Sequence, residues 1–394
     1  MKIVVITDCI HYKSEESICN KNPILTKQLD SLLTHFDKVV FVAPITPITG
    51  ENGQFNYYSK SLLDKTTFFS TPLAGGNSIW DKIKFAIIIP KWLKLFWKIR
   101  NFDIYYLRFP NNLNIISFLF YKLLNKKIVI TYTGTWQNYF NEPFTYRLQK
   151  YFIKYLHNGP AFVYSSDKEI IGGHIISSFS PSFTKRDCQL QFLRIKEKID
   201  KISKYKTEII EFITVGAVVE YKNQLLAIRL IQYLNEREMN VRLRIVGSGG
   251  EYLNSLKKIV QRDSLEKIII FEGYKSKSEL DLIYQESHFL LHTPTIEGYG
   301  KTIQEGFFNG LIPILTNFPY AKFFVGDDNE RGWIINNESL TRNDFFDELY
   351  TIINNPLEWT AMVNNGFEFA ATLTIDTWVE SYLNEINQLK VNEN

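Results

Sequence analysis

The fold is decided by one stretch of the chain, HTPTIEGYGKTIQEGFFNG at residues 292–310. It follows an apolar run typical of a buried strand, and its second half has the pattern of a helix that begins near residue 301. Glycines at 298 and 300 allow the backbone to approach a ligand closely. The free amides of Gly300, Lys301 and Thr302 then lie at a helix N-terminus, where the helix dipole favours phosphate. A strand, a glycine turn and such a helix together indicate an α/β protein.

Two carboxylates flank this glycine turn, Glu297 before it and Glu305 one turn into the helix. A carboxylate accepts two hydrogen bonds from vicinal hydroxyls, so the pair suits a ribose on one side of a phosphate and a sugar on the other. The Lys301 side chain either adds a positive charge to this site or faces water. Acidic residues are also common around helix starts, but the intervening glycine turn favours a ligand site.

Outward from this stretch, short β-branched runs alternate with helical patterns in both halves of the chain. Several runs are continuously apolar, as expected for parallel strands that are covered on both faces. The expected strands are 2–7, 39–42, 103–107, 128–133 and 161–164 in the first half, and 209–215, 242–246, 267–271, 288–291 and 312–315 in the second.

The chain of 394 residues is too long for one hydrophobic core. We expect an N-terminal domain at 1–185 and a C-terminal domain at 207–375. Residues 186–206 are expected to link them and to include a charged helix at 190–203. A terminal helix at 376–394 is expected to cross back onto the first domain.

Composition narrows the possible functions. Hydrophobic residues make up 45% of the chain, charged residues 22%, and the net charge of +3 gives no reason to expect nucleic-acid binding. Its three cysteines and six histidines form no ligand cluster, so neither a metal nor another cofactor is expected. The N-terminus lacks a signal-peptide pattern and no apolar run approaches the length of a membrane span, which predicts a cytoplasmic protein.

A basic and aromatic stretch at 83–100, IKFAIIIPKWLKLFWKIR, has two interpretations. It is either an amphipathic helix packed on a sheet, with its basic residues in water, or a peripheral contact with the inner membrane face. Pro90 interrupts the run and favours the first interpretation.

The Glu297–Glu305 spacing resembles the E-x7-E pattern of family-4 retaining glycosyltransferases, the glycosyl transferases group 1, which have the GT-B fold. The similarity continues over about 208–356. Further segments that resemble the family are VG at 215–216, EYKN at 220–223, LRIVGSG at 243–249, FEGY at 271–274 and GLIPILT at 310–316. The resemblance implies two facing Rossmann-like domains, with the donor site in the second.

The resemblance also implies roles for individual residues. As catalytic residues, Glu297 would bind hydroxyls of the transferred sugar and Lys222 would contact the donor diphosphate. The donor would otherwise be held by Gly216, which permits close approach of the first loop, by the backbone amides of Gly300, Lys301 and Thr302, by Glu305 at the ribose, and by Tyr274 near the nucleobase. Lys222 could instead be a solvated lysine at a helix start.

The implied reaction is sugar transfer from a UDP- or GDP-sugar to a glycan or lipid-linked acceptor, in the assembly of surface polysaccharide or another glycoconjugate. The donor is a substrate, so the enzyme would need no cofactor. The first domain would shape the acceptor site, with the aromatic residues Trp136, Tyr139 and Phe140 as sugar-stacking or core groups.

Two departures from the family pattern leave alternatives open. The arginine that usually follows the first-loop glycine is Ala217, and the histidine of the first domain has no counterpart at 133–136. In the family's mechanism the departing phosphate takes the acceptor proton, so a missing protein base matters less than a missing cation. A non-catalytic nucleotide-sugar-binding or partner protein is the main alternative, and an epimerase on the same fold is another.

Overall fold

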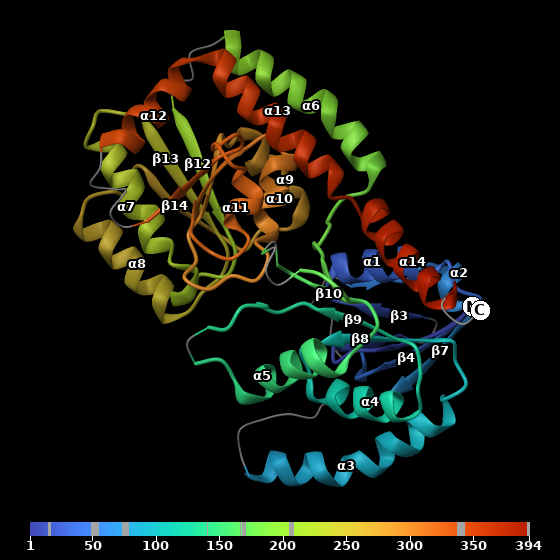
Figure 1. Cartoon of the computed structure of the whole chain (residues 1–394). Coiled ribbons are helices and arrows are strands. Elements are labelled where there is room, and N and C mark those ends of the chain that lie inside the picture. Colours follow the sequence, from blue (N-terminus) through green and yellow to red (C-terminus); the bar gives the residue numbers. More distant parts are fainter. Residues whose placement is uncertain are drawn as a thin grey trace. The chain divides into compact units, whose positions relative to one another are not determined.

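A computed structural model of the chain describes residues 1–14, 17–48, 55–72, 79–139, 141–165, 167, 171–204, 209–336 and 343–391 (Figure 1). The chain divides into two compact units. Unit 1 comprises residues 1–179 and 375–394, and unit 2 comprises residues 180–374. Across the described residues, no helix has the length and apolar character that a membrane span requires.

Unit 1 is built on a parallel seven-stranded sheet in the order β11-β10-β9-β8-β1-β4-β7. In chain order its strands are β1 (Lys2–Ile6), β4 (Lys38–Ala43), β7 (Thr66–Ser70), β8 (Ile104–Phe109), β9 (Ile128–Tyr132), β10 (Ala161–Val163) and β11 (Ile175–Ser177). The first strand lies inside the sheet, between the second and the fourth. This order is common to doubly wound α/β folds, and it leaves a switch point between β1 and β8.

Helices cover both faces of this sheet (Figure 1). Helices α3 (Ile79–Lys98) and α4 (Asn112–Leu123) contribute to one core cluster, and α1 (Pro23–Leu33) and α14 (Ile375–Val391) contribute to another. The remaining helices are α2 (Lys60–Leu63) and α5 (Phe144–Tyr151), and α5 continues into a π-helical turn at Phe152–Leu156.

The expectation that the C-terminal helix returns to the N-terminal sheet is confirmed. The Tyr382 ring of α14 stacks on Phe162 with 3.6 Å between ring centroids, and its hydroxyl lies 2.6 Å from Thr131 Oγ1. This hydroxyl has a buried partner, so the aromatic ring can enter the core without an unsatisfied polar group.

A second, four-stranded sheet was not expected from the sequence. It has the order β5-β2-β3-β6 and is formed by β2 (His11–Lys13), β3 (Ile18–Asn20), β5 (Ile45–Pro47) and β6 (Asn56–Tyr57). Its strands are two or three residues long, too short to produce a recognisable alternation in the sequence.

The stretch that includes 83–100 forms one helix, α3, with Pro90 inside it. Trp92 and Phe96 are buried against the sheet, as in an ordinary packed helix. Trp80, Ile87 and Trp97 are nevertheless exposed, so α3 also presents large apolar side chains to solvent.

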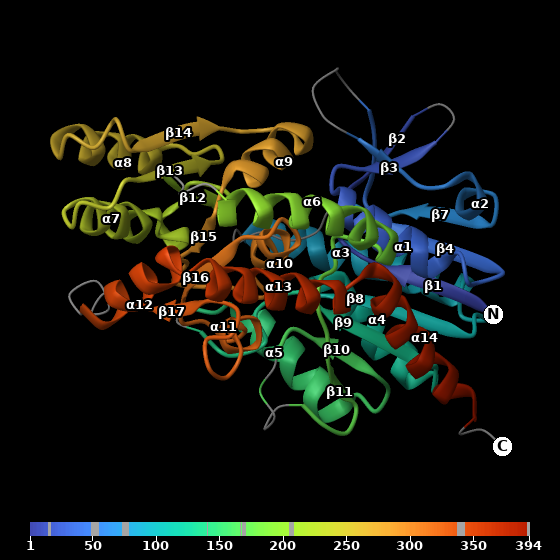
Figure 2. The ribbon, with the colours of Figure 1, turned by 90° about the horizontal axis from the view of Figure 1, so that it is seen from above.

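Unit 2 contains a parallel six-stranded sheet in the order β14-β13-β12-β15-β16-β17, which Figure 2 shows from above. Its strands are β12 (Ile210–Val215), β13 (Val241–Val246), β14 (Ile269–Gly273), β15 (Phe289–His292), β16 (Ile312–Thr316) and β17 (Trp333–Ile335). The order repeats that of unit 1, and the switch point here lies between β12 and β15. All ten expected strands are present in the two sheets, so the predicted α/β, Rossmann-like architecture is confirmed.

The helices of unit 2 are α6 (Lys185–Lys204), α7 (Gln224–Asn235), α8 (Glu251–Arg262), α9 (Lys277–Glu286), α10 (Lys301–Phe308), α11 (Ala321–Val325), α12 (Asn343–Asn354) and α13 (Pro356–Thr372), with a 3-10 turn at Glu220–Lys222. The charged helix expected within a linker is α6. It packs on α13 as part of unit 2 rather than standing between the units.

One lysine of α6 forms hydrogen bonds to other elements of unit 2. Lys198 Nζ donates hydrogen bonds to the carbonyl oxygens of Ser287, Asn309 and Tyr284, at 2.5, 3.0 and 3.2 Å. These carbonyls lie at the ends of α9 and α10, where helical backbone lacks internal donors.

We expect Lys198→Met to lower the free energy of unfolding by about 2 kcal/mol, because it leaves three carbonyls without this donor. Lys196→Met, on the exposed side of α6, is the matched control and should change stability little. Urea unfolding of both variants measures the difference. Equal stability of the two would show that Lys198 does not fasten the helix.

Candidate active site

The candidate site lies at the switch point of unit 2, where the loops after β12 and β15 meet. Gly216, the residue directly after β12, has φ of 144°, and its amide donates to the carbonyl of Val246. A Cβ on Gly247 would lie 1.8 Å from the Gly216 carbonyl oxygen. The loops after β12 and β13 therefore pass so close that Gly247, in the segment that resembles the family, must be glycine.

Hydrogen bonds between the loop after β12 and the loop after β15 position Lys222. The amide of Thr295 donates to the carbonyl of Tyr221 at 2.8 Å, and Thr293 Oγ1 donates to that of Asn223 at 3.0 Å. Asn223 adopts φ of 50° at the start of α7 and turns the chain sharply after the lysine. These contacts bring Lys222 Nζ to 2.6 Å from Glu297 Oε2.

Glu297 lies between two basic side chains. Besides Lys222, His292 Nε2 is 3.2 Å from the same carboxylate oxygen. Burial alone would raise the pKa of Glu297, but the hydrogen bonds and charges of His292 and Lys222 outweigh it and lower the pKa to about 2. The carboxylate is therefore ionised throughout the physiological range and can only accept hydrogen bonds.

His292 is a site residue that the sequence analysis did not single out. It is the last residue of β15 and is 6% exposed, and burial lowers its pKa. Its Nδ1 lies 3.1 Å from Thr302 Oγ1. The one sequence signal was its place at the end of a buried strand, immediately before the glycine turn.

Gly300 begins α10 in a conformation that requires glycine. Its φ is 82°, and a Cβ there would lie 2.7 Å from Ile303 Cδ1 and 3.1 Å from Phe318 Cζ. No described side chain caps this helix start, so the amides of Lys301 and Thr302 remain available to an anion. The Thr302 side chain also supports His292, a contact that the sequence did not predict.

Glu305 lies one turn further along α10. Ser182 Oγ and Tyr284 OH each donate to its carboxylate at 3.4 Å, and burial raises its pKa. Burial also lowers the pKa of Lys301 to about 8, against the opposing effect of the Glu305 charge. A lysine with this pKa changes its charge in mildly alkaline solution.

Not every candidate residue joins this cluster. Tyr274 follows β14, two strands from the switch point, and is 75% exposed. Two other cations of unit 2, Arg244 on β13 and Lys275 after β14, both pair with Glu272, at 3.8 and 2.9 Å, and Arg244 also pairs with Glu286 at 2.8 Å. Their charges are thus already balanced by carboxylates.

Among the described residues, no group of three or more histidine, cysteine, aspartate or glutamate side chains is arranged to hold a metal ion. The groups that the site does bring together are a partly buried carboxylate, two basic side chains and a helix N-terminus. Together they can bind a phosphorylated sugar through its phosphate and its hydroxyls.

A doubly wound sheet with an anion-binding helix at its switch point defines the class of nucleotide-binding α/β proteins. Residues 195–369 match the family described as glycosyl transferases group 1. Unit 2 therefore carries a group 1 glycosyltransferase domain.

Two curated relatives from Streptococcus pneumoniae match short stretches of the chain. Alpha-monoglucosyldiacylglycerol synthase of strain R6 is 32% identical over 92 residues, which are 23% of this chain and 21% of that protein. The GtfA subunit of UDP-N-acetylglucosamine–peptide N-acetylglucosaminyltransferase is 33% identical over 95 residues, or 24% and 18%. The matched stretches thus span about a fifth of these relatives.

Solved glycosyltransferases share the whole fold. Anabaena HepE in complex with UDP superposes with a TM-score of 0.68 at 13% identity, covering 98% of this chain and all of that one. A glycosyltransferase from Rickettsia africae gives 0.67 at 14% identity, with 98% of each chain covered. The fold is that of the GT-B glycosyltransferases.

Replacing Gly300 tests the helix start directly. We expect Gly300→Ala to lower the free energy of unfolding by about 1–3 kcal/mol, because alanine is strained at this φ and its Cβ meets Ile303. Gly250→Ala is the control, since a Cβ there meets nothing within 4 Å. Thermal and urea unfolding compare the two. A Gly300→Ala protein as stable as the control would contradict the assigned backbone geometry.

Proposed function

We propose that the protein is a retaining glycosyltransferase that moves a sugar from a UDP- or GDP-sugar to a glycan or lipid-linked acceptor. The reaction would belong to the assembly of surface polysaccharide or another glycoconjugate. The observation that carries the proposal is the contact of Lys222 and His292 with Glu297, beside the uncapped start of α10. This cluster lies within the matched domain.

Each group has a task in donor binding. The amides of Lys301 and Thr302 hold the diphosphate, and the Lys222 ammonium lies between that diphosphate and Glu297. Glu297, ionised at any pH above about 2, accepts hydrogen bonds from hydroxyls of the transferred sugar. Glu305 accepts hydrogen bonds from the ribose, with Ser182 and Tyr284 fixing its carboxylate.

In the transfer step, the bond between the anomeric carbon and the β-phosphate oxygen breaks, and a bond from the acceptor oxygen to that carbon forms on the same face. The acceptor proton passes to the departing phosphate, so no protein nucleophile is required. Stabilising the charge on that phosphate is then the main catalytic task of the protein. With Ala217 in place of an arginine, Lys222 and the α10 amides carry this task, and neither a metal nor a cofactor is part of the proposal.

The relatives support a choice of substrates. HepE was solved with UDP and the GtfA relative is named for UDP-N-acetylglucosamine, which favours uracil as the base. The synthase relative is named for a diacylglycerol glycolipid, which supports a lipid-linked acceptor. The alternative, a nucleotide-sugar-binding protein without transfer activity, is favoured by Ala217 and by the missing histidine at 133–136.

A thermal-shift screen against UDP, GDP, ADP, TDP and their sugars tests the donor site. A ligand that binds only the folded state raises the melting temperature. We expect one nucleotide family, UDP first, to raise it, and Lys222→Met and Glu305→Ala to weaken binding by at least about tenfold, since each loses a charge-assisted contact.

The controls for this screen are Lys258→Met and Glu266→Ala, which remove the same charges from exposed positions of unit 2. They should bind nucleotide like the unaltered protein. The donor proposal fails if no nucleotide raises the melting temperature. Binding without transfer or donor hydrolysis would instead favour the non-catalytic alternative.

Nucleotide affinity should fall as the pH rises from 7 to 9. With a pKa of about 8, Lys301 is charged at the lower pH and neutral at the higher, so its attraction for the diphosphate is lost across this range. Calorimetric titration with UDP measures the change. Lys301→Met should bind UDP more weakly at pH 7, and its UDP affinity should depend less on pH. If the variant and the unaltered protein show the same pH dependence, the Lys301 side chain does not contact the diphosphate.

Helix α3 supports a peripheral contact with an anionic membrane surface, which remains a proposal. Its exposed Trp80, Ile87 and Trp97 accompany exposed lysines, namely Lys84, Lys91, Lys94 and Lys98. Apolar side chains can enter the headgroup region while the lysines bind anionic lipids.

Sedimentation with vesicles tests this contact. We expect binding to vesicles that contain phosphatidylglycerol, weaker binding at high salt, and loss in Lys91→Gln/Lys94→Gln/Lys98→Gln. Lys27→Gln/Lys60→Gln/Lys65→Gln, altered elsewhere in unit 1, is the control. Salt-sensitive binding that survives in the α3 variant would exclude this helix as the anchor.

A further inference from the structure

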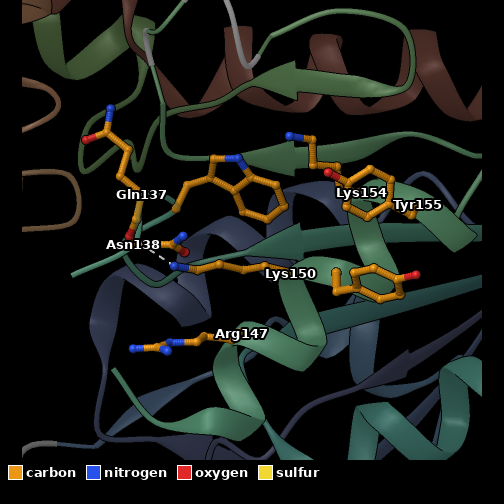
Figure 3. A pocket seen from close by; sticks show the side chains of 8 residues that line it. Gln137, Asn138, Arg147, Lys150, Lys154 and Tyr155 are labelled. Atoms are coloured by element: carbon orange, nitrogen blue, oxygen red, sulfur yellow. Dashed lines mark hydrogen bonds between the residues drawn. The ribbon is translucent and has the colours of Figure 1, made fainter. Parts of the chain in front are cut away.

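Unit 1 contains a pocket that the donor chemistry does not use (Figure 3). Its volume is about 360 Å³, within the range of small-molecule sites. All its lining residues belong to unit 1, whereas the donor site is made of unit 2 residues. The residues that line the pocket are Trp136, Gln137, Asn138, Arg147, Lys150, Tyr151, Lys154 and Tyr155.

The pocket lies where a ligand of this fold is expected. Trp136, Gln137 and Asn138 belong to the loop that leaves the carboxyl end of β9, and the other lining residues come from α5 and the π-helical turn after it. Ligands of doubly wound sheets bind beyond the carboxyl ends of the strands. π-Helical turns are rare and frequently occur at functional sites.

Positive charge dominates this pocket. Its eight lining residues include three cations and no acid. Lys150 pairs with Glu142, whose side chain is fully buried beneath it, and donates to the Gln137 carbonyl at 3.0 Å. One buried carboxylate thus opposes three cations, so about two positive charges remain.

The other two cations face solvent. Arg147 Nε lies 3.7 Å from Glu142 Oε2, but the Arg147 side chain is 58% exposed. Lys154 is exposed as well, and its Nζ lies 5.4 Å from the centre of the Tyr155 ring. In Figure 3 the charged ends of Arg147 and Lys150 point to the same side of the pocket. This arrangement can contact an anionic group from more than one direction.

Aromatic and amide groups complete the pocket. The Tyr151 and Tyr155 rings have centroids 5.0 Å apart, and both side chains are more than half exposed. Trp136 is almost buried and is held edge-on by Tyr132. Aromatic rings with polar ends suit ligands that have an apolar face and hydroxyls, as sugar rings do, and Gln137 and Asn138 add donors and acceptors.

We propose that this pocket binds the acceptor and that the acceptor is anionic, a sugar that carries a phosphate or a carboxylate. A neutral glycan would offer no negative charge to pair with Arg147 and Lys154. That the bound sugar is an acceptor rests on the proposed transferase function. The pocket's preference for an anionic sugar can be measured without transfer.

The test uses glucose, glucose 6-phosphate and glucuronate as probes of the full-length protein, by ligand-observed NMR titration. UDP is present in one series to occupy the phosphate site of unit 2. We expect at least one charged probe to bind about tenfold or more tightly than glucose, with or without UDP. Comparing the two charged probes distinguishes a phosphate from a carboxylate.

The variant Arg147→Gln/Lys154→Gln should lose this preference and bind the charged probes at least about tenfold more weakly. Both side chains are exposed, so the fold should be retained, which circular dichroism checks. Lys27→Gln/Lys60→Gln, which removes two exposed charges from α1 and α2, is the matched control. It should bind like the unaltered protein.

Equal affinities for glucose and both charged probes would overturn the inference, as would unchanged binding in the Arg147/Lys154 variant. Displacement of the probe by UDP would place it in unit 2 and also overturn it. Failure of the donor proposal is distinguishable, because it appears as absent UDP binding while these affinities are read independently. Donor hydrolysis without a charge preference in this pocket would leave the transferase proposal intact.

Discussion

A carboxylate that is largely withdrawn from water needs hydrogen-bond donors or positive charge beside it, and Lys222 and His292 supply these for Glu297 where the loops of unit 2 meet. Its two partners come from different strands of the sheet. His292 ends β15, and Lys222 follows β12, the strand on the other side of the switch point. Removing Lys222 would leave the partly buried carboxylate without its cation, and removing His292 would leave it without a hydrogen-bond donor. The contact therefore fixes the two loops against each other.

The same constraint explains the proposed chemistry. Because two basic groups hold the pKa of Glu297 near 2, the carboxylate cannot act as a proton donor, and it remains an acceptor for sugar hydroxyls. The uncapped start of α10 lies on the other side of the glycine turn and supplies the anion site. In the proposed reaction, Ala217 supplies no cation where the family usually has an arginine, so Lys222 would serve both the carboxylate and the departing phosphate. A change at Lys222 would then affect both the stability of the loops and the affinity for the donor.

The sequence predicted the regular parts of both units because their inner strands are continuous apolar runs. It missed β7, β11 and β17, which lie at or beside sheet edges, and the short strands β2, β3, β5 and β6. These strands are too short or too polar to produce such a run. In the site, Glu297, Glu305 and Gly300 could be found because their spacing is local. The roles of His292, Ser182 and Tyr284 depend on contacts between elements, which a linear pattern does not encode. Phe140 lies outside the described residues, so its expected role stays a prediction.

A crystal structure of the protein with bound UDP would show directly whether the start of α10 and Lys222 hold the donor diphosphate. We expect the β-phosphate to contact the amides of Lys301 and Thr302 and the ammonium of Lys222, with the ribose hydroxyls on Glu305. UDP bound elsewhere, for example against Arg147 and Lys154 in unit 1, would contradict it. So would a diphosphate at α10 with Lys222 still paired to Glu297 alone, because the lysine would then have no part in supporting the leaving group.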